Sequence, residues 1–383
     1  MHTSLFQVSP KLIALFVLLF LSPRSHAQLT FEYAQVGGQP ILLDFYPPTN
    51  GANNAPLIIW IHGGGWQNNT RAITGHSLRL RSEGFAVASI DYRLTSQAGQ
   101  WGSESVSWPA QAHDIKAAVR WLRANADTLG VNPCAFISWG TSAGGHLSAI
   151  LGTSNGDPFL EGTLGNHLDT SSNVQLAVDY FGPTDLLNMN PDVTDPPGSI
   201  VDHDAIDSGE SLLLGSETTG ISVGEIRDHI DDPNNPWVSL NALAVSASPA
   251  LLAEHAPSNV PFFIAHGDSD PVVPFNQSNR LLGALQATSI PSQLLPVIGA
   301  GHNLPTWVTD DHLLPWLEQQ LALLPSCQCP ADLNNNGRLN FFDVSIYITA
   351  YSNQNPIADF TGDGQFNFLD VSAFLSAFGA GCP

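Results

Sequence analysis

Short apolar runs alternate with helix-forming segments along most of the chain, and this alternation limits the possible folds more than any other feature. The runs are rich in β-branched or aromatic residues, which indicates strands at 57–61, 85–90, 135–139, 174–180, 261–265 and 293–297. The segments with helical apolar spacing are 111–126, 278–286 and 305–324. Strands that alternate with helices form a parallel sheet covered on both faces, so we predict an α/β fold with a doubly wound, mostly parallel sheet.

Two segments interrupt this rhythm. Residues 184–258 are rich in acidic residues, Pro and Gly, and we expect either a functional lid-like loop or a solvated acidic excursion. After Pro325 the composition shifts to Asn, Asp, Gly and Phe. We therefore predict three parts, which are a signal peptide over 1–27, an α/β domain over 28–326 and a small module over 327–383.

The N-terminus has the pattern of a cleaved secretory signal peptide. Lys11 is followed by the apolar run 12–21, and the small residues Ser25 and Ala27 precede the expected cleavage point after Ala27. The run is about half of the roughly 20 residues that a membrane span needs. We therefore expect a secreted, extracellular protein without stable membrane insertion.

Charge and cysteine content exclude some partners and suggest a compartment. The chain has 12 Lys and Arg against 34 Asp and Glu, for a net charge of -22, so we expect no nucleic-acid partner. Four cysteines in an oxidising compartment suggest disulfides, and three pairings are open. We favour Cys329 with Cys382, which would close the last segment, and Cys134 with Cys327.

A candidate nucleophile follows the predicted strand 135–139. The sequence Gly140-Thr141-Ser142-Ala143-Gly144 leads from that strand into a helix-compatible segment, which is the setting of a nucleophile elbow. Upstream, the strand 57–61 leads into the glycine loop His62-Gly63-Gly64-Gly65-Trp66. Three successive glycines let backbone N–H groups face one point, as an oxyanion hole requires. The pattern predicts acyl transfer with Ser142 as nucleophile.

The base and the acid are expected downstream of Ser142, in the chain order Ser, Asp, His. His302 lies in a glycine-rich loop just past the strand 293–297, whereas His62, His146 and His266 fit packed or turn positions better. Asp268 and Asp270 compete for the third role. Asp270 is favoured because the following Pro-rich stretch fixes its loop, while turn formation alone explains Asp268.

Five ordered motifs together resemble the α/β-hydrolase fold, namely 62–66, 91–93, 140–146, 266–270 and 301–302. More narrowly they resemble its esterase/lipase branch, which includes hormone-sensitive-lipase-like enzymes and bacterial feruloyl and acetylxylan esterases. The resemblance implies a catalytic triad of Ser142, Asp270 and His302. It also implies oxyanion donors at Gly64, Gly65 and Ala143, with the N–H of Trp66 as an alternative, and no cofactor for catalysis.

The C-terminal segment contains a duplication at an offset of 27 residues. In each loop oxygen ligands fall at positions 1, 3, 5 and 12 with Gly at position 6, which suits Ca²⁺. The ligands are Asp332, Asn334, Asn336 and Asp343 in the first loop and Asp359, Thr361, Asp363 and Asp370 in the second. Position 7 would add a backbone carbonyl from Arg338 or Gln365. We predict a small all-α module with structural Ca²⁺, and two Asx-rich turns without metal are the alternative.

Position 12 is Asp rather than the Glu of a regular EF-hand, and no helix-like run precedes the first loop. With the duplication, this resembles the dockerin type I modules of polysaccharide-degrading systems. The resemblance implies a cohesin-like or cell-surface protein partner.

The motifs predict a serine esterase, and the two resemblances point to acetyl or feruloyl esters on polysaccharide. Trp66, Trp101 and Trp108 are candidates for a stacking wall against the substrate or for core packing. The alternatives are a general short-chain carboxylesterase or lipase acting on small esters, a peptidase of the same fold, and a non-catalytic scaffold or binding protein.

Overall fold

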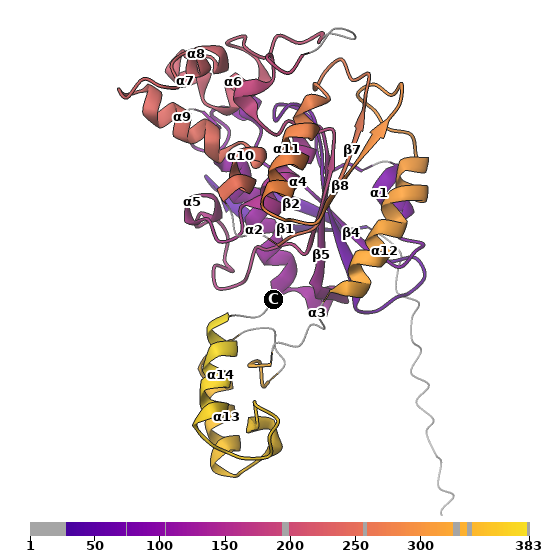
Figure 1. The fold of residues 1–383 in the computed structure, drawn as a ribbon, viewed down its shortest axis with the longest axis vertical. Helices are drawn as coiled ribbons and strands as arrows, with labels where there is room; N and C mark the ends of the chain where they lie inside the picture. Colours follow the sequence, from indigo (N-terminus) through magenta and orange to yellow (C-terminus); the bar gives the residue numbers. More distant parts are fainter. Residues whose placement is uncertain are drawn as a thin grey trace, which may run out of the picture.

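The computed structural model describes residues 28–73, 75–103, 105–193, 199–255, 259–324, 330–334 and 339–380. Its centre is an eight-stranded sheet in the order β1-β2-β4-β3-β5-β6-β7-β8 (Figure 1). The strands are β1 (Leu29–Val36), β2 (Gln39–Tyr46), β3 (Ala55–Ile61), β4 (Ala86–Ile90), β5 (Val131–Thr141), β6 (Leu176–Tyr180), β7 (Phe262–Gly267) and β8 (Ser292–Val297). Strand β2 is antiparallel to β1 and β4, and all other pairs are parallel, which confirms the predicted mostly parallel sheet.

Helices connect the parallel strands. Up to residue 324 and outside the 184–258 segment, the helices are α1 (His76–Arg79), α2 (Ala110–Ala124), α3 (Ala126–Leu129), α4 (Ala143–Thr153), α5 (Pro158–Glu161), α11 (Asn276–Ala287) and, after the last strand, α12 (Leu314–Leu323), with a 3-10 turn η1 (Thr95–Gln97). The predicted helix 305–324 begins with a π-helical turn, η3 (Val308–Leu313), before α12. Among the described residues, no helix has the length and apolar character needed to cross a membrane.

Both faces of the sheet are covered, as a doubly wound fold requires. On β3, Leu57, Ile59 and Ile61 enter one buried cluster, whereas Ile58 and Trp60 enter the other. The first cluster contains side chains of α2, α4 and α11, and the second contains side chains of α12. Because successive strand residues point to opposite faces, a strand buried on both sides is apolar throughout.

Strands β1 and β2 were not among the predicted strands. They form a hairpin whose turn is Gly37-Gly38, both with positive φ (56° and 78°), a region that glycine adopts without strain. Phe31 and Tyr33 of β1 face the helices, while Leu29 is exposed. This half-exposed edge lacks the continuous apolar run that marks the inner strands.

The 184–258 segment is not an extended loop over its described residues. It folds into a 3-10 turn η2 (Leu186–Asn188) and the helices α6 (Gly209–Leu213), α7 (Ser216–Thr219), α8 (Val223–Asp228), α9 (Trp237–Ser246) and α10 (Pro249–His255), of which α6 to α9 group together in Figure 1. Leu213, Val223 and Ile226 are buried. Several of its acids are paired, among them Asp204 with Arg227 and Asp192 with Arg280. The segment is therefore a packed helical layer rather than a solvated excursion.

The C-terminal part has its own small apolar core. It contains helices α13 (Phe341–Ser352) and α14 (Phe368–Ala380) and a 3-10 turn η4 (Pro356–Ala358), drawn in yellow in Figure 1. Tyr347 of α13 stacks on Phe374 of α14 with ring centroids 4.0 Å apart.

Cys134 of β5 is disulfide-bonded. The predicted signal peptide, Cys327, Cys329, Cys382 and the predicted ligand Asn336 lie outside the described residues.

Candidate active site

Ser142 lies at the turn from β5 into α4. Its backbone angles, φ of 55° and ψ of −126°, are strained for any residue other than glycine. Small neighbours allow this turn: a Cβ added to Gly140 would lie 2.1 Å from the Gly144 carbonyl oxygen. A Cβ on Gly144 would lie 2.1 Å from the Ile61 carbonyl oxygen. The two glycines of the Gly-x-Ser-x-Gly motif are therefore required by close backbone approach.

The structure brings Ser142, His302 and Asp270 into one hydrogen-bonded row. His302 Nε2 is 3.0 Å from Ser142 Oγ, and His302 Nδ1 is 2.7 Å from Asp270 Oδ2. The His302 side chain is 21% exposed and that of Asp270 is fully buried. The His302 ring also packs edge-on against Phe181, which follows β6, with centroids 4.7 Å apart. The three residues predicted from separate strand ends thus meet at one edge of the sheet.

Asp270 is held by its own loop, the acid loop (residues 268–273). Its Oδ1 accepts hydrogen bonds from the backbone N–H groups of Val272 (2.8 Å) and Val273 (3.1 Å). Burial opposes ionisation, but the hydrogen bonds from His266 and His302 hold the pKa of Asp270 below its ordinary value. The rival Asp268 instead accepts from the Gly299 N–H at 2.6 Å, which is a turn contact.

His266 is a site neighbour that the sequence analysis placed among packed histidines. Its Nε2 lies 3.2 Å from Asp270 Oδ2 and 3.1 Å from the Val273 carbonyl oxygen. Its Nδ1 lies 2.7 Å from Ser278 Oγ on α11. Because the Val273 carbonyl only accepts, Nε2 carries a proton, and His266 donates toward the oxygen that His302 also uses. The spacing of four residues from Asp270 is the only local signal of this contact.

The glycine loop lies beside Ser142. A Cβ on Gly63 would lie 3.2 Å from Ser142 Cβ, and Gly64 and Gly65 have φ of 113° and 60°. Ala143 is the first residue of α4, where a backbone N–H has no carbonyl of its own helix to bind. The three predicted oxyanion donors therefore belong to two segments that flank the nucleophile.

Buried side chains brace this loop. Trp66 Nε1 donates to His146 Nδ1 at 3.1 Å, and His146 Nε2 donates to the Ala247 carbonyl at 2.8 Å. Burial lowers the pKa of His146 to about 4, so its ring is neutral. Trp66 and Trp108 are 1% and 3% exposed and therefore belong to the core rather than to a substrate wall. Trp101 is partly buried, and its Nε1 donates to Gln97.

The second C-terminal loop gathers some of its predicted ligands. Thr361 Oγ1 lies 2.8 Å from Asp370 Oδ1 and 3.4 Å from Asp359 Oδ1. In the first loop, Asp343 is buried and accepts from the Leu333 N–H at 3.1 Å. Within the described ranges, no group of three or more His, Cys, Asp or Glu side chains is close enough to hold a metal ion.

A serine at a strained strand-to-helix turn, with a histidine and a carboxylate from later strand ends of a parallel sheet, defines the α/β-hydrolase class. Residues 43–285 match the BD-FAE family, and the chain belongs to this family of α/β-hydrolase esterases.

Relatives agree with this assignment. Esterase LipC of Mycobacterium tuberculosis is 31% identical over 253 residues, covering 65% of this chain and 53% of LipC. Esterase LipQ of the same organism is 29% identical over 255 residues, covering 65% and 51%. The chain thus spans about half the length of these curated relatives. A solved structure, a truncated carbohydrate esterase from gut microbiota, is 30% identical with a TM-score of 0.60 and covers 77% of this chain and 96% of its own.

Proposed function

We propose that this chain is a serine carboxylic ester hydrolase that acts through Ser142, His302 and Asp270. The observation that carries the proposal is the hydrogen-bonded row from Ser142 Oγ through His302 to Asp270 Oδ2, starting at the strained turn before α4. Membership of an esterase family supports it independently. A non-catalytic scaffold would have no need for a buried carboxylate aligned with an accessible histidine and serine.

The chemistry follows from the positions of the protons. His302 Nε2 accepts the Ser142 proton as Oγ attacks the ester carbonyl, and Asp270 stabilises the resulting imidazolium through Nδ1–H. The backbone N–H groups of Gly64, Gly65 and Ala143 receive the oxyanion. His302 then gives its proton to the departing alcohol, leaving an acyl-enzyme. Water repeats the sequence to release the acid, and no step calls on a cofactor.

The proposed substrates are acetyl or feruloyl esters linked to polysaccharide. A similar solved structure is described as a carbohydrate esterase, and the C-terminal duplication resembles modules of polysaccharide-degrading systems. General short-chain esters are the alternative, because the curated relatives are named only as esterases. Secretion is part of the proposal, supported by the apolar run 12–21 after Lys11 and by the disulfide-bonded Cys134.

A matched substrate panel tests the proposal. We expect the full chain to hydrolyse p-nitrophenyl acetate together with acetylated xylan or methyl ferulate, and Ser142→Ala to lose all of these activities. Released acetate and ferulate are measured by chromatography. Hydrolysis of p-nitrophenyl acetate alone would replace the polysaccharide assignment by a general carboxylesterase. Absence of Ser142-dependent hydrolysis on every substrate would remove the esterase assignment.

We also propose that the C-terminal module binds structural Ca²⁺ and docks onto a cohesin-like or cell-surface partner. The donor set is entirely oxygen, which suits Ca²⁺, and Thr361 already lies between Asp359 and Asp370. Asp332, Asn334 and Asp343 would serve the first loop, and Asp363 would complete the second. Bound Ca²⁺ would stabilise this module, because its apolar core is small.

Calcium titration of the chelator-treated full chain tests this part. We expect about two Ca²⁺ per chain and a higher unfolding temperature for the module, because metal binds the folded loops only. Asp370→Ala is expected to remove one of the two binding events in isothermal titration calorimetry. Asp228→Ala, which changes an exposed acid on α8, serves as the matched control and should bind as wild type does. If the wild-type chain bound no Ca²⁺, the proposal would fail and the two loops would be Asx-rich turns without metal.

A further inference from the structure

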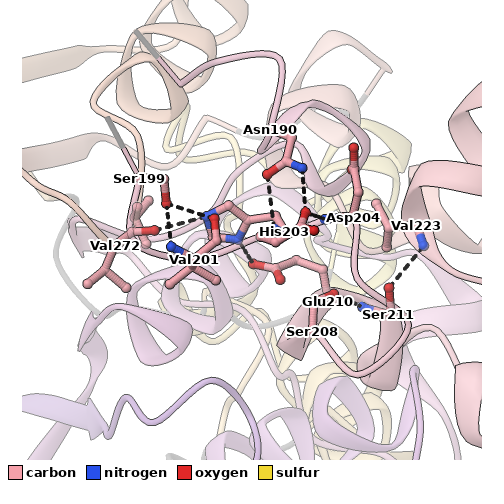
Figure 2. Close-up of polar contacts among 12 residues, drawn as sticks. Asn190, Ser199, Val201, His203, Asp204, Ser208, Glu210, Ser211, Val223 and Val272 are labelled. Carbon is pink, nitrogen blue, oxygen red and sulfur yellow. Dashed lines mark hydrogen bonds and ion pairs between the residues drawn. The ribbon is translucent and has the colours of Figure 1, made fainter. Parts of the chain in front are cut away.

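We propose that His203 and Glu210 form a buried pair that positions the acid loop, and through it Asp270 and His302. The inference rests on the proposed function, because it assigns a role to a pair that touches no reacting atom. Figure 2 shows His203 between Glu210 on one side and Val272 on the other. His203 Nδ1 is 3.0 Å from Glu210 Oε1, and Nε2 is 3.0 Å from the Val272 carbonyl oxygen.

Two successive peptide planes of the acid loop connect this pair to Asp270. In the first plane, the Pro271 carbonyl accepts from the Ile200 N–H (2.8 Å), and the Val272 N–H donates to Asp270 Oδ1. In the second, the Val272 carbonyl accepts from His203, and the Val273 N–H donates to the same Oδ1. A trans peptide is planar with its C=O and N–H on opposite sides. Fixing the carbonyl edge therefore fixes the direction of the amide that holds Asp270.

The same pair reaches the other half of the site. Glu210 is the second residue of α6, and its neighbour Gly209 packs on the glycine loop. A Cβ on Gly209 would lie 3.2 Å from the Gly65 carbonyl oxygen. The pair thus connects the acid loop to α6, the helix that packs on the glycine loop. Both side chains are buried, with residue exposures of 2% and 4%.

Hydrogen-bond roles require a shared proton between His203 and Glu210. The Val272 carbonyl only accepts, so Nε2 of His203 carries a proton. The remaining contact joins Nδ1 to a carboxylate oxygen. Without a proton on either atom, two lone pairs would face and repel each other, so this contact needs a second proton. Burial opposes the charge, but the hydrogen bond from His203 Nδ1 to the Glu210 carboxylate raises the pKa of His203 above its ordinary value of 6.5.

The other charged groups near His203 are already engaged. Asp204 pairs with Arg227 of α8, and Asp202 accepts from Asn190 Nδ2 at 2.8 Å. On the side of the acid loop, the Val272 carbonyl oxygen faces the His203 ring. The Asp270 carboxylate lies on the opposite side of the two peptide planes, where it accepts from their N–H groups. Because the folded-state pKa is raised, the stabilisation from the pair is complete below about pH 6.5 and is lost as the pH rises through that raised value.

Three variants separate positioning from general stability. His203→Ala should lower kcat on p-nitrophenyl acetate about 10- to 100-fold with KM changed less than about twofold, because misorientation affects the chemical step. Glu210→Gln should keep kcat near wild type, since an amide N–H can donate to a neutral Nδ1. Wild type should lose kcat at alkaline pH, and Glu210→Gln should lack this loss. His229→Ala, which changes a histidine stacked on Trp237 away from the acid loop, is the control and should match wild type.

A second readout does not depend on hydrolysis. The His302 Nδ1–H proton shared with Asp270 should give a downfield proton resonance in wild type and Glu210→Gln, and it should shift or broaden in His203→Ala. An unchanged resonance with unchanged kcat in His203→Ala would overturn the positioning role. A wild-type alkaline loss that persists in Glu210→Gln would overturn the shared proton. If no Ser142-dependent activity exists, the proposed function fails, while the resonance still decides whether His203 positions the acid loop.

Discussion

Replacing Ser142 with Ala is expected to lower kcat for ester hydrolysis by about 10⁶-fold, and replacing His302 as well should cost almost nothing more. In the proposed mechanism Oγ and Nε2, which lie 3.0 Å apart, act in one step, so the base has no function without the nucleophile. The two single variants and the double variant are compared by kcat on p-nitrophenyl acetate. Residual rates above the uncatalysed reaction should be similar in all three, because the backbone donors of the glycine loop remain.

The control for this series is Ser239→Ala, which removes an exposed hydroxyl on α9 and should leave kcat within about twofold. Circular dichroism and thermal unfolding verify that each variant is folded. Two results would contradict the assignment. One is a Ser142→Ala enzyme with substantial activity, and the other is a double variant that is far slower than either single variant, which would mean that the two groups act separately.

Much of this fold was predictable because its inner strands carry their own signal. A strand buried on both faces must be apolar throughout, as on β3, and a serine nucleophile needs small neighbours at a strand end. Chain order predicted an acid and His302 after separate strands, but it could not separate Asp270 from Asp268; the Pro-rich stretch after Asp270 and the family resemblance made that choice. The β1–β2 hairpin was missed because one side of β1 is exposed and its apolar residues are therefore interrupted.

The remaining site contacts have no local sequence signal. His203 meets Val272 across 69 residues, and which histidine meets which carbonyl is set by how the 184–258 segment packs. Trp66 illustrates the same limit, because a tryptophan beside a glycine loop fits either a substrate wall or the core. Its hydrogen bond to His146, 80 residues away, places it in the core. Such partners depend on tertiary packing rather than on periodicity.

Asp270→Asn is expected to lower kcat by about 10⁴-fold at neutral pH, with little effect on KM. In the proposed mechanism the Asp270 carboxylate, 2.7 Å from His302 Nδ1, fixes the tautomer with Nδ1–H and stabilises the imidazolium. An amide of the same shape carries no charge and can donate its own N–H toward Nδ1. His302 would then present a protonated Nε2 to Ser142, which cannot act as a base. Steady-state kinetics on p-nitrophenyl acetate measure the loss.

The same variant has a pH signature whose sign is fixed by the pKa. Because the pKa of Asp270 is depressed below 3.8 in the folded protein, its ionised form contributes stability above about pH 3.8, and this contribution is lost as the pH falls through the depressed value. Urea unfolding should therefore show wild type more stable than Asp270→Asn near pH 7, with a smaller difference in strong acid. Asp268→Asn, whose carboxylate accepts from the Gly299 N–H and the Ser269 hydroxyl, should keep kcat within a few-fold. If Asp268→Asn rather than Asp270→Asn abolished activity, the rival carboxylate would be the one that serves His302.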